Sequence, residues 1–214
     1  MHEIVIRIDL VAAACDGKLN LTPPYAREYS YLQFRRICEL LALGCLQLHG
    51  DLPSSQTSSA KKEWNATKIM NRLHRDHAHA FPQSTTNTKN DKGWHLEANS
   101  KPDALTLKEF KALYNKCGEI LHRGTIKTIE IESGVSKKDY DEVLKWQKKI
   151  VDLVNQHIIT RPNKKGLYFI SMKSENGLPA CSVFSNFNEG SVEVANYNLI
   201  ITGEGHLEDN VTKN

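Results

Sequence analysis

The sequence predicts an α+β protein made mainly of helices: a bundle of four or five helices, followed by a small C-terminal antiparallel β-hairpin or three-stranded element. Three observations support this prediction. Residues 25–48 contain no helix breaker except Gly44 and carry apolar side chains at helical spacing. Thr106 and Glu109 have the spacing of a capping box, which marks the start of a helix. Near the C-terminus, Asn176-Gly177 separates two short apolar runs, as in a β-hairpin.

The length and composition are those of an ordinary globular protein. The chain has 214 residues, of which 40% are hydrophobic and 25% are charged. We expect one domain over residues 1–214, with a helical part at about 1–158, a β appendage at about 159–202 and a frayed tail at 203–214. The formal net charge of +3 does not itself indicate nucleic-acid binding, but it is compatible with a local basic patch.

The cysteines favour a reducing compartment. Five are present, at wide spacings, and Cys38 and Cys45 lie inside an apolar helical stretch. An odd number of cysteines in such positions is typical of free thiols and not of a disulfide framework. No run of about 18 apolar residues predicts a membrane span, and the first residues lack the features of a signal peptide. We therefore expect a cytoplasmic protein without membrane contact.

The first half of the chain is expected to be helical. Residues 3–14 fit both a strand and a helix, and the pattern leaves both open, with a slight preference for helix. Pro23-Pro24 precedes the central and most buried helix, at 25–48. A second helix is expected at 61–80 with Trp64 and His77 directed towards the core, and a loop at 83–101. The apolar positions of the central helix are Tyr31, Phe34, Ile37, Cys38, Leu41, Cys45 and Leu48.

The second half is expected to hold two further helices and the β element. One helix follows the capping box at 106–109 and carries apolar residues as far as Leu121. The other covers 137 to about 157, where apolar residues again recur at helical spacing. Strands are expected at 166–172 and 180–184, and a third at 192–201.

A first candidate catalytic group lies on the second helix. Arg72 and His77 are spaced R-x4-H, the minimal pattern of HEPN-type ribonucleases. A histidine that titrates near neutral pH can move a proton from a ribose 2′-hydroxyl, and an arginine can hold the phosphate. The alternative is a polar helical surface with His77 partly buried, which needs no functional explanation.

A second candidate is the segment 114–124, whose ending Ile120-Leu121-His122 resembles the close of the HEPN motif. The motif's arginine position is occupied here by Cys117-Gly118. The resemblance covers about residues 24–158. It implies a degenerate HEPN-like helical protein that acts through protein or nucleic-acid contacts, which is the leading hypothesis. The alternative is a metal-independent HEPN-type ribonuclease that uses Arg72 and His77 with help from His122. Such sites commonly form between two copies, so the resemblance also implies a homodimer.

The sequence offers two further candidate sites, a metal site and an RNA-binding patch. Cys45 and His49 lie one helical turn apart and, with the histidines at 74–79, could form part of a metal site in an enzyme. Packed cysteines and surface histidines explain these residues better, and we expect neither a metal nor another cofactor. Trp94 with Lys92 and Lys101 forms a candidate RNA-binding patch, in which the indole stacks on a base and the lysines contact phosphates. The alternative is a tryptophan that anchors a loop.

Overall fold

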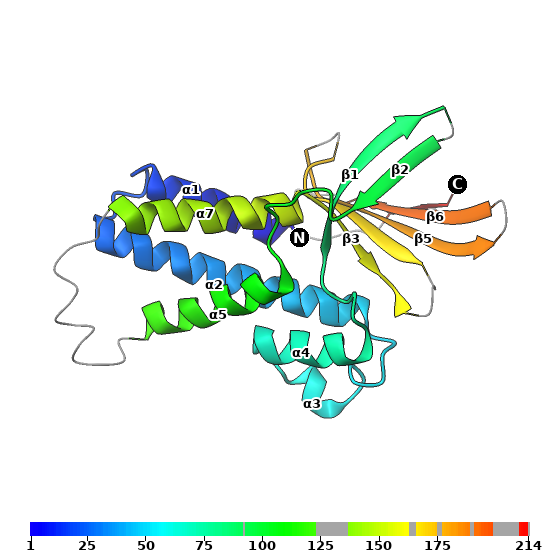
Figure 1. Cartoon of the computed structure of the whole chain (residues 1–214), viewed down its shortest axis with the longest axis horizontal. Coiled ribbons are helices and arrows are strands. Elements are labelled where there is room, and N and C mark those ends of the chain that lie inside the picture. Colours follow the sequence, from blue (N-terminus) through cyan, green and yellow to red (C-terminus); the bar gives the residue numbers. More distant parts are fainter. Residues whose placement is uncertain are drawn as a thin grey trace.

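The computed structural model describes residues 1–91, 93–122, 137–162, 166–174, 177–188, 191–198 and 210–213. Figure 1 shows the long helices packed side by side and the sheet extending from one end of them. The helices are α1 (His2–Cys15), α2 (Pro23–Leu48), α3 (Ser58–Lys61), α4 (Ala66–Asp76), α5 (Leu107–Leu121) and α7 (Lys137–Val154). The strands are β1 (Gln83–Asn90), β2 (Gly93–Ala98), β3 (Gln156–Thr160), β4 (Leu167–Ser171), β5 (Ala180–Asn188), β6 (Ser191–Asn198) and β7 (Asn210–Lys213).

Helix α2 is the central element of the fold, as the sequence predicts. It packs against α1, α4, α5 and α7, and its predicted stripe is buried from Tyr31 to Cys45. The stripe is narrower than the apolar composition of the helix suggests, since Leu43 is exposed. Segment 3–14, which the pattern left open, forms helix α1 and buries Ile4 and Val11 against the same core.

The expectation of a helical bundle with a small C-terminal β element is wrong. The described strands form one seven-stranded sheet with the order β2-β1-β3-β4-β5-β6-β7, and every neighbouring pair is antiparallel. The expected strands near the C-terminus correspond to β4, β5 and β6. The additional strands come from the expected loop at 83–101 (β1 and β2), the expected end of the last helix (β3) and the expected tail (β7).

The additional strands carry weak sequence signals. Strand β1 has the sequence Gln-Ser-Thr-Thr-Asn-Thr-Lys-Asn, without one apolar residue. Its pairing with β2 and β3 buries Ser84 and Thr85, and the Thr85 hydroxyl donates to the Glu97 carbonyl at 2.8 Å. Strand β3 follows α7 with no proline or glycine between them. Most of β1 pairs with β2 and all of β3 pairs with β4, the next strands along the chain, while Gln83 and Ser84 join β1 to β3. Pairing between strands therefore determines them, and apolar alternation does not.

Helix α5 begins as the sequence predicts. The Thr106 hydroxyl accepts from the backbone N–H of Glu109 at 3.3 Å, and a Glu109 carboxylate oxygen accepts from the backbone N–H of Thr106 at 3.0 Å. This capping box satisfies two backbone donors that the helix itself leaves unpaired. In the described part of the chain, no helix has the length and apolarity needed to cross a membrane.

His157, in β3, is a buried histidine between the sheet and the helices. It pairs across the sheet with Ile170, and its Nδ1 lies 3.0 Å from the carbonyl oxygen of Val154. Burial lowers the pKa of His157 from 6.5 to about 4. The ring is therefore neutral near pH 7, with the proton on Nδ1, from which it is donated to Val154.

We predict that this histidine makes the protein less stable as the pH falls from about 6.5 to about 4. Over this range the unfolded chain binds a proton that folded His157 does not, so the stabilisation is complete above pH 6.5 and is lost towards pH 4. The full loss is on the order of 3 kcal/mol. Urea unfolding across this range should show a steeper decline for the unmodified protein than for His157→Asn. Identical declines would contradict the assignment.

Candidate functional site

Helix α4 divides its residues between the core and one polar surface. Ile69, Met70 and Leu73 are buried, while Lys68 and Arg75 are exposed. Asn65 starts the helix by accepting from the backbone N–H of Lys68 at 3.0 Å. Side chains three and four residues apart lie on the same face of a helix, so Lys68, Arg72 and Arg75 form one basic row.

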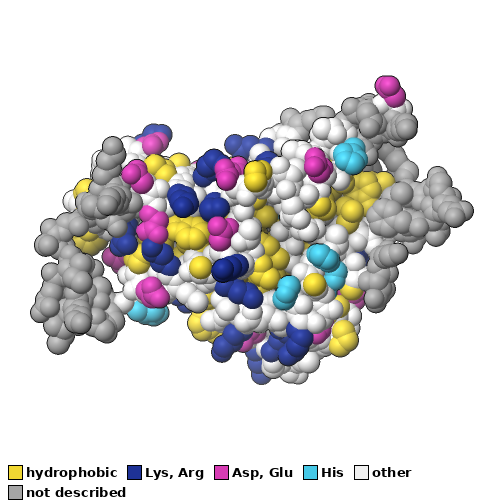
Figure 2. All heavy atoms as spheres, viewed as in Figure 1, with side chains coloured by type: hydrophobic (Ala, Val, Ile, Leu, Met, Phe, Trp, Pro, Cys, Tyr) yellow, Lys and Arg dark blue, Asp and Glu magenta, His cyan; other side chains and the backbone are white. Residues whose placement is uncertain are grey.

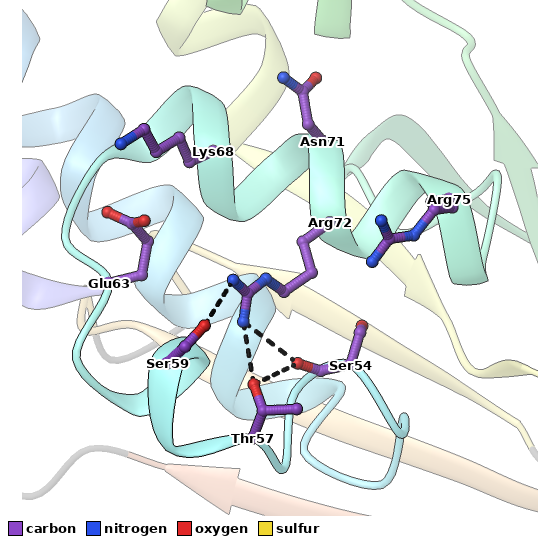
Figure 3. Close-up of a pocket in the computed structure, with 8 residues that line it drawn as sticks. All are labelled: Ser54, Thr57, Ser59, Glu63, Lys68, Asn71, Arg72 and Arg75. Carbon is purple, nitrogen blue, oxygen red and sulfur yellow. Dashed lines mark hydrogen bonds between the residues drawn. The ribbon is translucent and has the colours of Figure 1, made fainter.

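Arg72 connects this row to the loop before α3. Its Nη1 donates to the Thr57 hydroxyl at 3.0 Å and lies 3.5 Å from the Ser54 carbonyl oxygen, while Nη2 donates to the Ser59 hydroxyl at 2.9 Å. Figure 3 shows the guanidinium pointing into this set of oxygens. All three acceptors are uncharged. Within the described residues no carboxylate lies at salt-bridge distance from Arg72, so the interactions position its positive charge without neutralising it.

The residues around Arg72 line an open depression of about 680 Å³. Lys68 and Arg75 lie on the two sides of Arg72, and Asn71 points away from it (Figure 3). Because the Ser59 oxygen accepts from Arg72, its own O–H remains oriented to donate elsewhere. Cations together with a hydroxyl donor in one depression are suited to binding an anionic oxygen group such as a phosphate.

Glu63 is the acidic residue of this depression. Its Oε1 accepts from the backbone N–H groups of Asn65 at 3.0 Å and Trp64 at 3.1 Å. The bond from Asn65 is the main cause that lowers the pKa of Glu63, and Lys68 and Arg72 lower it further. The carboxylate is therefore ionised at neutral pH and opposes the binding of an anion.

Trp64 is exposed, contrary to the expectation that it lies in the core. Its exposed fraction is 60%, because α3 ends at Lys61 and α4 begins at Ala66, so Trp64 belongs to the short linker between them. The linker is fixed by Glu63, whose carboxylate accepts from the backbone of Trp64. A tryptophan on a fixed backbone with its ring in solvent differs from a core residue and offers a flat apolar surface.

Positive charge is concentrated in this part of the chain. Residues 58–76 contain five Lys and Arg against two Asp and Glu, a local excess that equals the net charge of +3 of the whole chain. Figure 2 shows Lys and Arg side chains gathered over α3 and α4. We call this the α3–α4 surface and define it as Lys61, Lys62, Trp64, Lys68, Arg72 and Arg75.

His77 does not join Arg72 in this depression. Helix α4 ends at Asp76, and His77 adopts an extended conformation. Its Nε2 lies 3.0 Å from the carbonyl oxygen of Thr160, at the end of β3. Burial is the main cause that lowers the pKa of His77, and neighbouring His49 and His79 lower it further. The R-x4-H spacing therefore does not place both side chains on one face, and their catalytic role stays a prediction.

The histidines around Thr160 connect the helices to the sheet. His49 is fully buried; its Nδ1 lies 2.8 Å from the Cys45 carbonyl oxygen and its Nε2 lies 3.2 Å from the Thr160 carbonyl oxygen. The ring centroids of His49 and His77 are 5.6 Å apart. The Nε2 atoms of His49 and His77 both face the carbonyl oxygen of Thr160, and Nδ1 of His49 faces that of Cys45, so these nitrogens are directed at backbone carbonyl groups. In the described residues, no group of three or more His, Cys, Asp or Glu has the geometry to hold a metal ion.

The third candidate catalytic residue, His122, is exposed and follows the last residue of α5. In Figure 1 this end of α5 points away from the end of α4 that precedes His77. Arg35, which the sequence analysis did not select, approaches the same part of α5. A Cβ at Gly118 would lie 3.7 Å from its Nη1, but Glu39 pairs with Arg35 at 3.2 Å.

Cys117, at the motif's arginine position, is buried, and burial raises the pKa of its thiol to about 12. It is therefore a neutral core side chain at physiological pH. The structure does not bring Arg72, His77 and His122 into one cleft.

The predicted patch of Trp94, Lys92 and Lys101 is divided along the hairpin. Trp94 is the second residue of β2 and pairs with Lys89 near the hairpin tip, whereas Lys101 follows the other end of β2. Lys101 lines a second depression, of about 350 Å³, together with His74 and His79. Lys92 and the side chain of Trp94 lie outside the described residues, so their RNA-binding role stays a prediction.

Comparisons with protein-family models, curated proteins and solved structures find no match for this chain. The resemblance to HEPN proteins therefore stays a prediction. The α3–α4 surface is the strongest functional feature among the described residues, because it combines positive charge, oriented hydroxyl groups and an exposed aromatic ring.

We predict that Arg72 stabilises the fold as well as carrying charge. Arg72→Gln should lower the free energy of unfolding by about 1–2 kcal/mol, because the hydrogen bonds to Thr57 and Ser59 are lost. Arg75→Gln, on the same helix, should change it by less than about 0.5 kcal/mol, as for an ordinary surface substitution. Chemical denaturation measures both values, and equal effects would show that Arg72 does not hold the loop.

Proposed function

We propose that this protein binds single-stranded nucleic acid, RNA foremost, through the α3–α4 surface and without cleaving it. The observation that carries the proposal is the exposed ring of Trp64 in a segment, residues 58–76, that also carries five lysines and arginines. Aromatic rings that stack on bases, together with cations that follow the phosphate backbone, are the usual means of binding single strands without strong sequence preference.

The backbone around Trp64 supports a stacking role. Glu63 holds the backbone N–H of Trp64, and Asn65 caps the following helix. Both interactions fix the linker before any ligand binds, so little conformational entropy is lost when a base stacks on the ring. Lys61 and Lys62, on the α3 side of the ring, are exposed and within reach of a phosphate backbone.

The depression at Arg72 supports a phosphate contact. The guanidinium is already oriented by Thr57 and Ser59, and Lys68 and Arg75 add positive charge on its two sides (Figure 3). Phosphate contacts release counterions, so affinity that arises here should fall with salt concentration. The proposed complex therefore has a base on Trp64 and a neighbouring phosphate at Arg72.

The separation of the candidate catalytic residues within one chain supports the non-catalytic part of the proposal. His77 faces Thr160, and His122 follows a different helix. A degenerate HEPN-like protein, with Cys117 in place of the motif's arginine, is compatible with binding alone. Cleavage of the bound RNA that is lost on His122→Ala would contradict this and favour the ribonuclease alternative.

We also propose a cytoplasmic location. All five cysteines are free thiols, and burial raises the pKa of Cys45 to about 12, which keeps this thiol protonated and unreactive. A reducing compartment suits such cysteines.

We predict that Trp64→Ala weakens binding of a fluorescently labelled oligouridine by about tenfold, because one stacking interaction is lost. Fluorescence anisotropy at low salt measures the dissociation constant. Tyr25→Ala is the matched control, since Tyr25 is 58% exposed and Trp64 is 60% exposed, but Tyr25 lies at the start of α2. Equal effects of the two substitutions, or no binding by the unmodified protein, would refute the proposal. A DNA strand of the same length tests the preference for RNA.

We predict the opposite effect for Glu63→Gln. Glutamine retains an oxygen that can accept from the backbone of Trp64 and Asn65, but it removes the negative charge from the depression. Affinity for the oligouridine should rise about two- to fourfold at low salt, and the gain should shrink as salt screens the charges. Glu28→Gln, an exposed position on α2, controls for net charge. A similar gain from Glu28→Gln would show that the anion does not bind near Glu63.

A further inference from the structure

A separate cavity lies between α2 and the sheet, away from the α3–α4 surface. It has a volume of about 310 Å³ and is mainly apolar. Its floor is a row of paired residues across three strands, His157, Ile170 and Cys181. Leu40, Gly44 and Leu48, one helical turn apart on α2, form a wall. We call it the α2–β3 cavity.

Gly44 makes room for this cavity. A Cβ built at this position would meet no atom within 4 Å, so the packing around α2 does not require a glycine here. Glycine in the interior of a helix is unfavourable compared with alanine. A larger side chain would both strengthen the helix and fill the space, and its absence leaves the cavity open.

His157 gives the cavity one oriented polar group. The ring is 4% exposed, and its Nδ1 is used by the carbonyl oxygen of Val154. Among the described residues, Nε2 has no hydrogen-bond partner. Because burial lowers the pKa of His157 to about 4, with the nearby amino group of Met1 adding to the effect, the ring is neutral and Nε2 carries a lone pair. Nε2 is not one of the fully buried polar atoms of the described residues, so it is open to the cavity, where a ligand or water can donate to it.

The side chains of the remaining lining are uncharged, and Gln47, the other polar side chain there, is exposed. Met1 is also part of the lining, and burial is the main cause that lowers the pKa of its amino group, which favours the uncharged amine. The thiols of Cys45 and Cys181 are protonated, since burial raises their pKa values to about 12 and about 11. The volume is at the lower end of the range for small-molecule sites and about twice that of a cavity that accepts benzene.

We propose that the α2–β3 cavity binds a small, neutral, apolar molecule with one hydroxyl group, such as a medium-chain alcohol, whose O–H donates to Nε2 of His157. The chain of the ligand lies against Leu40, Gly44 and Ile170. This site is independent of the nucleic-acid site, and either can exist without the other.

The test compares two isomers, 1-octanol and heptyl methyl ether, by isothermal titration calorimetry. They have the same number of atoms, but only the alcohol has an O–H to donate. The unmodified protein should bind the alcohol about tenfold more tightly, the difference expected for one hydrogen bond in an apolar site. Equal affinities would remove His157 from the proposal, and no binding of either isomer up to its solubility limit would overturn the proposal as a whole.

Three variants test whether the alcohol binds in the α2–β3 cavity. Gly44→Leu should abolish binding of both isomers by filling the cavity, whereas Glu28→Leu, the same new side chain at an exposed position of α2, should leave it unchanged. His157→Asn keeps a donor for Val154 but removes Nε2, so the preference for the alcohol should disappear. Circular dichroism confirms folding. If His157→Asn does not fold, the comparison of the two isomers and the Gly44→Leu variant together test the proposal. Unchanged binding of the alcohol by folded Gly44→Leu would contradict the proposed site.

Discussion

The packing of the apolar stripe of α2 is the interaction on which the other parts of the structure depend. α1, α4, α5 and α7 all contact this helix, and Phe34, Ile37 and Cys38 are completely buried at its centre. Helix α4 contributes Ile69 and Leu73 to the same core. The helical period places the basic row of α4 on the side opposite its buried residues. The packing of α4 against α2 therefore directs this row into solvent.

The sequence was most informative where burial repeats at short range. The stripe of α2 and the capping box of α5 depend on residues three or four positions apart, and both were predicted correctly. Strand β1 contains no apolar residue, and β3 directly follows the helix that ends at Val154. Each strand pairs mainly with the next strand along the chain, and Gln83 and Ser84 join β1 to the distant β3. Neither pairing is marked by apolar alternation, so the size of the sheet could not be deduced from local patterns.

The candidate site is only partly predictable, because its geometry depends on where helix α4 begins and ends. The spacing of Arg72 and His77 predicts a shared site, but the helix ends between them, and the two side chains contact different parts of the fold. One continuous helix over residues 61–80 would place Trp64 in the core, but α3 ends at Lys61 and α4 begins at Ala66. Asn65, a favourable residue for a helix start, was the local signal that a new helix begins there. With that boundary, Trp64 falls in a linker and its exposure becomes understandable.

The structure therefore separates two kinds of surface. The charged side of α4 lies in solvent, while the space beneath α2 is mainly apolar, with Nε2 of His157 as an acceptor that is open to it. The central claim concerns the first, and ultraviolet crosslinking of the protein to oligouridine, with mass spectrometry of the crosslinked peptides, tests it most directly. The account predicts crosslinks concentrated in residues 58–77, with Trp64 among them. Crosslinks confined to the β1–β2 hairpin or to α5, with none in residues 58–77, would contradict it.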